Sequence, residues 1–168
     1  MAIAYRKQRP PSNIEHHYTP EPLARRLVRL VPVGPDDVVL DPAAGKTRIF
    51  VKSIAARRIL YCEVDEGMDF MSHSLDYDWA ITNPPYHLLW KFIDKTSQEA
   101  RKGFAFLVNI NGINTLTPKR LALLEQRRFH MRSLHVCNVK QWMGRYYFYV
   151  FRRDVRAIQL SWDLQSWQ

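Results

Sequence analysis

The chain has 168 residues, enough for one domain with a continuous core, and its apolar (46%) and charged (24%) fractions are those of an ordinary folded protein. Its longest apolar runs are too short to cross a bilayer, and no apolar stretch follows the basic residues of the N-terminus, so we expect neither a membrane span nor a secretory signal. The net charge of +9 arises in the second half, where residues 91–153 hold 13 Lys and Arg against three acidic residues, which favours a nucleic acid partner over a merely solvated basic face.

The first segment, residues 1–17, is polar, basic and proline-containing, and we expect it to be a flexible arm. Thr19 can cap a helix that has Pro20 at its first position, and leucines at helical spacing continue this helix until Val33-Gly34-Pro35 ends it. Short apolar runs then alternate with amphipathic segments. The predicted strands are 38–40, 59–64, 79–82 and 104–110, and the predicted helices are 47–56, 87–100 and 118–128. Two more strands, 133–139 and 146–152, are predicted to be joined through Met143-Gly144.

This alternation predicts an α/β fold: an open, mostly parallel sheet with helices on both faces and a terminal antiparallel hairpin. We expect one domain over residues 18–168, in which 158–168 form either an edge strand or a partner contact. Ligands of such sheets bind at the carboxyl ends of the strands, which here carry Asp41, Glu63, Asn83 and Asn109.

Cysteine and histidine usage gives no sign of a metal site. Cys62 and Cys137 lack the spacing of metal ligands or of a disulfide framework, and we expect two reduced core thiols in a cytoplasmic protein. All six histidines are expected to be surface or satisfied residues, so no metal is predicted.

Three signals in the first half indicate a nucleoside-binding site. The small-residue turn Asp41-Pro42-Ala43-Ala44-Gly45 allows backbone N–H groups to approach a ligand closely. It is not a phosphate-binding P-loop, because Leu40 stands where that motif needs glycine. Glu63 can accept hydrogen bonds from ribose hydroxyls. Asp69 and Phe70 suit the amino group and the ring face of adenine, although such a pair is often a surface acid beside a core aromatic.

The tetrapeptide Asn83-Pro84-Pro85-Tyr86 follows a predicted strand and indicates the reacting half of the site. An exocyclic amine is a weak nucleophile because its lone pair is delocalised. The side-chain oxygen of Asn83 and the backbone carbonyl of Pro84 can accept its two N–H protons and orient it, while Tyr86 can stack on a planar base. The alternative is a proline-stiffened turn capped by a core tyrosine.

The order of these motifs resembles the class I S-adenosylmethionine-dependent amino-methyltransferases with a Rossmann-like fold, and best the gamma-class adenine-N6 DNA methyltransferases. The resemblance covers roughly residues 18–110, judged by motif order. It implies that S-adenosyl-L-methionine is bound by Tyr18, Thr19, Pro20, Asp41, Ala43, Gly45, Glu63, Asp69, Phe70 and Asn83. It also implies that Asn83, Pro84, Pro85 and Tyr86 are catalytic, and that an aromatic near the late hairpin packs on the flipped base together with Tyr86; Trp142 is the first candidate and Tyr146 the second.

Two departures from that family affect the expected function. Thr47 stands where a second glycine is common, and we expect no separate target-recognition domain beside the catalytic one. Sequence specificity would then come from the basic half, from a second copy or from a partner subunit, or be low. We expect N6-adenine methylation of nucleic acid, with DNA favoured over RNA recognised by shape. The alternatives are a glutamine-N5 protein methyltransferase and a catalytically silent nucleic-acid-binding protein.

Overall fold

The computed structural model describes residues 18–140, 142, 144–155 and 158–167, so the predicted arm 1–17 and Met143 of the predicted hairpin turn lie outside the described residues. The helices are α1 (Glu21–Val28), α2 (Ile49–Ser53), α3 (Leu89–Glu99), α4 (Ile110–Asn114) and α5 (Pro118–Gln126), with short 3-10 helices η1 (Val64–Glu66), η2 (Phe70–Ser72) and η3 (Tyr86–Leu88). The strands are β1 (Val38–Asp41), β2 (Arg58–Tyr61), β3 (Trp79–Thr82), β4 (Gly103–Asn109), β5 (Phe129–Val139), β6 (Tyr146–Arg153) and β7 (Gln159–Trp167).

All of these strands form one sheet in the order β2-β1-β3-β4-β6-β5-β7. The first four are parallel to one another, whereas β6 runs antiparallel to both β4 and β5. The predicted mostly parallel sheet with a terminal hairpin is therefore confirmed. The C-terminal segment adds β7, which pairs parallel to β5 at the edge of the sheet.

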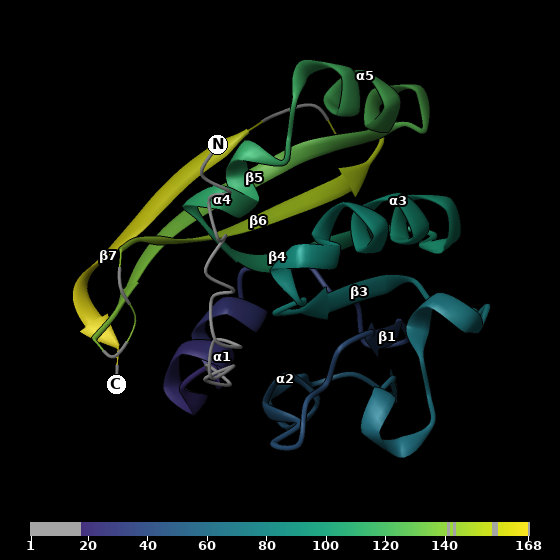
Figure 1. Cartoon of the computed structure of the whole chain (residues 1–168), viewed down its shortest axis with the longest axis horizontal. Coiled ribbons are helices and arrows are strands. Elements are labelled where there is room, and N and C mark those ends of the chain that lie inside the picture. Colours follow the sequence, from purple (N-terminus) through teal and green to yellow (C-terminus); the bar gives the residue numbers. More distant parts are fainter. Residues whose placement is uncertain (1–17, 141, 143, 156–157, 168) are drawn as a thin grey trace, which may run out of the picture.

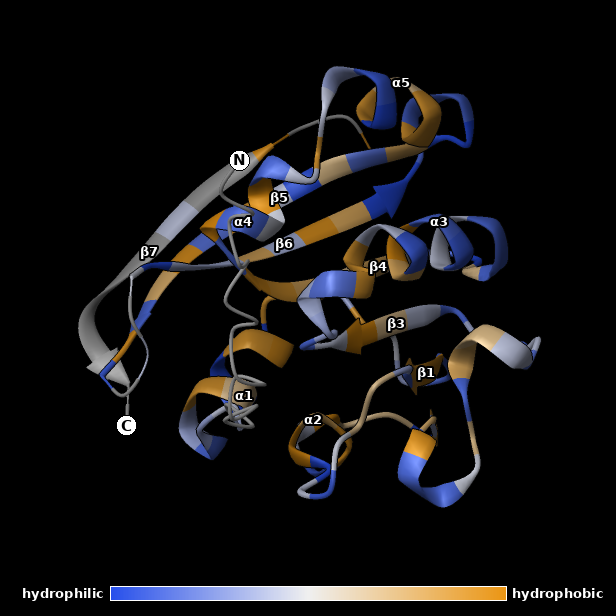
Figure 2. Cartoon of the chain, viewed as in Figure 1, coloured by the Kyte–Doolittle hydropathy of each residue, from blue (hydrophilic) through white to orange (hydrophobic). Residues whose placement is uncertain are grey.

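Helices cover both faces of the sheet, with α1 and α2 on one side and α3 and α5 on the other (Figure 1). Side chains of β4 alternate between the two resulting cores: Ala105 and Leu107 face α1, and Phe104 and Phe106 face α3. Because both faces are covered, all four residues of β3 are buried and β4 is apolar along most of its length, as the orange colouring of β4 in Figure 2 shows.

Several predicted boundaries were wrong for local physical reasons. Pro20 rather than Thr19 is the N-cap of α1, and α1 ends at Val28 instead of continuing to Val33. The second strand ends at Tyr61, because the Glu63 carboxylate accepts from the backbone N–H of Asp65 and starts η1. β5 begins earlier than predicted, at Phe129, and its pairing with β6 shifts register after Met131.

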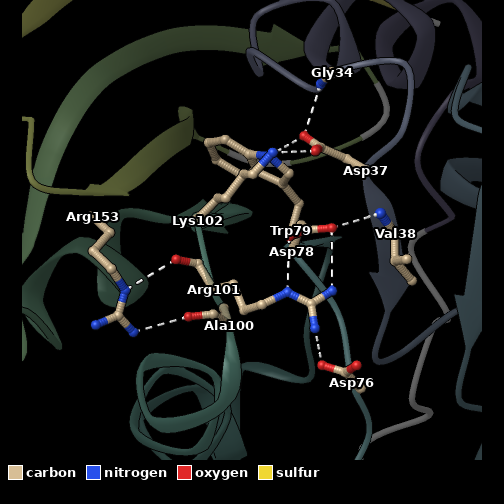
Figure 3. Close-up of polar contacts among 10 residues, drawn as sticks. All are labelled: Gly34, Asp37, Val38, Asp76, Asp78, Trp79, Ala100, Arg101, Lys102 and Arg153. Atoms are coloured by element: carbon tan, nitrogen blue, oxygen red, sulfur yellow. Dashed lines mark hydrogen bonds and ion pairs between the residues drawn. The ribbon is translucent and has the colours of Figure 1, made fainter.

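The amino edge of the sheet, where β1, β3 and β4 begin, is closed by polar contacts (Figure 3). The buried Asp37 accepts from the Trp79 indole N–H at 3.0 Å and pairs with Lys102. Asp78 accepts from the backbone N–H of Val38 and from the Arg101 guanidinium, both at 2.9 Å. These contacts connect the starts of the three strands at the edge opposite the predicted site.

No helix within the described ranges is long and apolar enough to cross a membrane.

Candidate active site at the carboxyl edge of the sheet

The turn after β1 is held by the neighbouring strands. The backbone N–H of Cys62 donates to the carbonyl of Asp41 at 2.9 Å, and the N–H of Ala44 donates to the carbonyl of Cys62 at 3.0 Å. From the other side, the Thr82 hydroxyl lies 3.4 Å from the carbonyl of Ala43. The turn Asp41–Gly45 is thereby fixed between the ends of β2 and β3, and its ligand-binding role stays a prediction.

Asp41 is fully buried at the base of this turn. Its Oδ1 accepts from the backbone N–H of Ala43 at 3.2 Å, whereas its Oδ2 has no hydrogen-bond partner among the described residues. Burial raises the pKa of Asp41 to about 7, although the nearby Thr82 hydroxyl and the backbone N–H of Ala43 act to lower it. A buried carboxylate oxygen without a donor is suited to receive a cationic N–H group from a ligand.

Gly45 ends the turn in the left-handed region, with a φ of 62°. A Cβ at this position would lie 3.9 Å from the Tyr18 ring. Tyr18, which is 44% exposed, therefore lies against the turn although 27 positions separate it from Gly45 in the sequence. The predicted N-terminal cofactor segment and the turn thus meet at one place.

The two acids after β2 each cap a short helix. Glu63 Oε1 accepts from the N–H of Asp65 at 3.2 Å, and the oxygens of Asp69 accept from the N–H of Met71 at 2.9 Å and from the Ser72 hydroxyl at 3.1 Å. Both side chains are partly exposed, and a carboxylate has acceptor capacity beyond these bonds. Their roles toward ribose and adenine stay predictions.

Phe70, predicted to stack on adenine, lies inside the core. It is 1% exposed, packs on Phe92 with 5.3 Å between ring centroids, and carries the Lys95 ammonium 5.3 Å above its ring. In this arrangement its ring faces are occupied by protein. The adenine-stacking role of Phe70 stays a prediction and would require Lys95 to move or only the ring edge to be used.

Asn83 lies at the carboxyl end of β3, held by one residue on each side. Its Nδ2 donates to the Thr19 hydroxyl at 3.3 Å, and its Oδ1 accepts from the Tyr86 hydroxyl at 3.1 Å. Thr19 is buried and does not cap α1, contrary to the prediction from the sequence. Its hydroxyl instead contacts Asn83, the proposed catalytic residue. No signal in the sequence alone identified this contact, because 64 positions separate the two residues.

The Pro84 carbonyl accepts no hydrogen bond within the part of the chain that the structure describes, whereas the Pro85 carbonyl accepts from Leu88 in η3. Pro84 is buried, and the following proline restricts it to extended backbone conformations. The role of this carbonyl as an acceptor for the substrate amine stays a prediction.

The aromatic residues predicted to hold the substrate are packed inward. The Tyr86 ring packs against both hydrophobic cores, and burial, with a smaller contribution from Tyr146, raises its pKa. Trp142 and Tyr146 are each 6% exposed and pack on one another with 4.5 Å between ring centroids. The structure therefore brings the three rings into one core cluster rather than onto an open surface, and their contact with a substrate base stays a prediction.

Much of the basic charge predicted to face nucleic acid lies at the amino edge and is neutralised there. Ion pairs join Lys102 to Asp37, Arg101 to Asp78, Arg127 to Asp94 and Arg128 to Asp154. The excess charge of residues 91–153 therefore overstates the field that this half presents. In the described ranges no group of three or more His, Cys, Asp and Glu side chains is arranged to hold a metal ion.

No family model matches the sequence, and no curated protein matches it. Solved structures do match the fold. One from Pyrococcus horikoshii, named as an RNA methyltransferase, is 16% identical with a TM-score of 0.67, over 88% of this chain and 92% of the other. The 23S rRNA methyltransferase ErmE is 15% identical with a TM-score of 0.62, over 81% of this chain and 69% of the other.

A third match is the modification subunit of a type I restriction enzyme from Vibrio vulnificus, 14% identical with a TM-score of 0.60. It covers 85% of this chain, but this chain spans less than half (46%) of that subunit. At such identities the similarity establishes the fold: the chain has the Rossmann-like α/β fold of class I methyltransferases.

Proposed function

We propose that this protein is an S-adenosylmethionine-dependent methyltransferase that methylates the N6 amino group of adenine in nucleic acid. The observation that carries the proposal is the pair of acceptors at the end of β3, Asn83 Oδ1 and the Pro84 carbonyl, held beside the turn of the buried Asp41. The fold and the motif order both support a methyl donor bound along the carboxyl ends of β1 and β2.

The residues around this turn fit S-adenosylmethionine chemically. The unpartnered Asp41 Oδ2 suits the ammonium group of the methionine end, and the left-handed Gly45 leaves room beside the Tyr18 ring. The partly exposed carboxylates of Glu63 and Asp69 suit hydroxyl and amino donors. When bound, S-adenosylmethionine supplies an electrophilic methyl group on a sulfonium sulfur.

Orientation of the acceptor amine is the contribution we assign to Asn83 and Pro84. Their two oxygens accept the two N–H protons of the exocyclic amine, which draws electron density toward nitrogen and directs its lone pair. The substrate nitrogen forms a bond to the methyl carbon as the carbon–sulfur bond breaks, the electron pair stays on sulfur, and the nitrogen loses one proton to water. Because Tyr86 now donates to Asn83 Oδ1, the substrate must share or displace that hydrogen bond.

Nucleic acid is favoured over protein as the substrate class. The matching structures are named for ribosomal RNA, RNA and restriction-modification enzymes, and the net charge of the chain is +9. DNA is favoured by the resemblance of the motif order, whereas RNA is favoured by the names of two matching structures. The same pair of acceptors would also serve a glutamine amide in a protein substrate, which makes that class the second candidate. Specificity would come from this domain, from a second copy or from a partner subunit.

The test is a parallel assay of the full chain with labelled S-adenosylmethionine and DNA, RNA or protein as the acceptor. The proposal predicts label in nucleic acid and its recovery as N6-methyladenine after digestion. Label found only in protein would replace adenine by glutamine as the substrate. Normal cofactor binding without transfer to any polymer would favour a silent binding protein.

A further inference from the structure

The basic residues of the second half divide into two groups by their place on the sheet. Most of those at the amino edge are held in the ion pairs described above, and Arg153 donates to the backbone carbonyls of Ala100, Arg101 and Arg127. Five cations at the opposite, carboxyl edge have no ion pair within the described part of the chain. They are Lys91 in α3, Lys119 and Arg120 in α5, and Lys140 and Arg145 in the turn between β5 and β6.

These free cations lie at the carboxyl edge, on the elements around the proposed active site. α3 follows the Asn83 loop directly through η3, so Lys91 is in its first turn. α5 follows the carboxyl end of β4 through the short α4 (Figure 1). Asn109 at that end pairs with Tyr146, which puts Arg145 at the same edge. The net positive field of this half is thus directed to the side where the substrate must enter.

One of the five cations is fixed on an aromatic ring. The guanidinium carbon of Arg120 lies 4.5 Å from the ring centroid of Trp90, the second residue of α3. Arg120 Nη1 donates to the Thr115 carbonyl at 3.0 Å, and its other N–H groups have no partner among the described residues. Both side chains are partly exposed. This pair therefore offers a planar cation with free N–H donors. Its aromatic member, Trp90, is only four positions along the chain from Tyr86.

We propose that the Trp90–Arg120 pair, with Lys91 and Lys119 beside it, is the docking surface for unpaired nucleotides that flank the target adenine. The inference rests on the proposed function and deepens it. An unpaired base exposes a ring face that stacks on a guanidinium plane, while the free N–H groups and the two lysines contact phosphates. A continuous duplex has its ring faces stacked internally and offers only phosphates. The surface therefore favours a single-stranded segment over a duplex.

The test measures binding of the full chain to fluorescent oligonucleotides by anisotropy, over a series of salt concentrations. Single-stranded DNA, single-stranded RNA and a duplex of the same sequence are the probes. Arg120→Ala removes the planar cation, Arg120→Lys keeps only the charge, and Lys91→Ala removes an exposed charge without touching the stack. Arg57→Ala is the matched control, since Arg57 is an exposed cation at the amino edge.

We expect single strands to bind more tightly than the duplex, and Arg120→Ala to weaken single-strand binding by about tenfold. Arg120→Lys should restore only part of the affinity. Lys91→Ala should lower the slope of log affinity against log salt by about one, as expected for one lost phosphate contact. Arg57→Ala should change neither quantity. Thermal unfolding of each variant checks that the fold is kept.

The proposal is overturned if Arg120→Ala and Lys91→Ala bind single strands as tightly as the wild type, or if Arg57→Ala lowers single-strand affinity as much as they do. It is also overturned if the duplex binds as tightly as the single strands and its affinity falls equally in the variants. An acidic protein that competes for the surface more strongly than any oligonucleotide also contradicts it. Failure of the proposed function is seen separately: methyl transfer at nucleic acid concentrations well below saturation that is unaffected by these variants refutes the docking surface alone, whereas absence of transfer to any polymer refutes the function.

Discussion

At the scale of single residues, the orientation of the Asn83 carboxamide depends on a residue far away in the sequence. Thr19 Oγ1 accepts from Nδ2, and the Tyr86 hydroxyl donates to Oδ1. An amide that loses one of these partners can rotate and present N–H where an acceptor oxygen is needed. Thr19 is therefore proposed as a positioning residue for the transfer step, in addition to any contact it makes with the cofactor.

We expect Thr19→Val, which keeps the shape but removes the acceptor, to lower kcat by about tenfold, equivalent to about 1.4 kcal/mol. Thr19→Ser keeps the hydroxyl and should retain most of the activity. Steady-state kinetics with varied S-adenosylmethionine separates this effect from a cofactor effect, which would raise KM instead. Equal kinetics for the valine and serine variants would contradict the positioning role.

The buried Asp41 couples the stability of the free protein to pH. An unfolded chain releases this proton near the ordinary pKa of 3.8, whereas burial raises the pKa to about 7 in the folded state. Between these values the folded protein binds more protons, so the contribution of Asp41 to stability is complete below 3.8 and is lost as pH rises through 7. Asp41→Asn should therefore raise the thermal unfolding midpoint of the free protein at about pH 8. A lower midpoint for the variant would show that ionised Asp41 stabilises the free fold.

Cofactor binding should have the opposite pH dependence. A bound ammonium favours ionised Asp41, so at a pH below 7 binding must also release the proton. We expect the affinity for S-adenosylmethionine to rise with pH up to about 7 and the Asp41→Asn variant to lose this part of the rise, measured by calorimetry. Titration of the cofactor itself affects both proteins equally, so it cancels when the affinities of the wild type and the variant are compared at each pH. The same pH profile in both would argue against a contact between Asp41 and the ammonium group.

At the scale of elements, Arg153 at the end of β6 joins the ends of two helices. Its guanidinium donates to the carbonyls of Ala100 at 3.0 Å, Arg101 at 3.1 Å and Arg127 at 3.3 Å, and lies over the Phe129 ring at 4.6 Å. Ala100 and Arg127 are the C-caps of α3 and α5. One side chain thus satisfies carbonyls that the helices leave without partners.

Arg153→Lys keeps the charge but cannot reproduce this arrangement, and we expect it to lower the free energy of unfolding by about 2 kcal/mol. Arg128→Lys is the matched control: its exposed pair with Asp154 should contribute less than about 0.5 kcal/mol. Urea denaturation of the three proteins makes the comparison. A similar decrease in the free energy of unfolding in both variants would mean that the carbonyl contacts of Arg153 add no stability.

The sequence predicted those elements whose signal is local. The apolar runs of β1, β3 and β4 identified strands because they are buried on both faces. Asp41 was placed correctly at the carboxyl end of β1 for the same reason. Element ends were missed where one side chain decided them, as at Glu63 and Pro20.

Features that depend on distant contacts could not be predicted from the sequence. The inward packing of Tyr86 depends on Tyr146 and the two cores, and the contact of Thr19 with Asn83 joins segments far apart in the chain. The charge of residues 91–153 was counted correctly, but only the sheet register shows that several of its cations pair at the edge away from the site.

At the scale of the whole molecule, the two edges of the sheet differ in how their polar groups are satisfied. The amino edge is closed by hydrogen bonds and ion pairs around Asp37 and Asp78. The carboxyl edge keeps acceptors that have no donor among the described residues, such as Asp41 Oδ2 and the Pro84 carbonyl. A ligand that supplies donors to the carboxyl edge should therefore stabilise the entire fold.

We expect S-adenosylmethionine at about one hundred times its Kd to stabilise the protein by about 2.7 kcal/mol, which for a chain of this size raises the Tm by about 5–10 °C. Differential scanning fluorimetry measures the shift, with ATP at the same concentration as a nucleotide control. The Asp41→Asn protein should respond less at equal ligand. An unchanged Tm at millimolar ligand would indicate that the turn after β1 does not hold this cofactor.

The central claim is that Asn83 organises methyl transfer to an amino nitrogen at the end of β3. It is tested most directly by comparing wild type and Asn83→Ala, with label transfer from S-adenosylmethionine to nucleic acid and cofactor affinity measured on the same preparations. The account predicts that transfer by the variant falls at least about a hundredfold, as for removal of a transition-state hydrogen-bonding group, while its cofactor affinity changes by less than about tenfold. Substantial transfer by Asn83→Ala, or its complete loss of cofactor binding with an intact fold, would contradict the account.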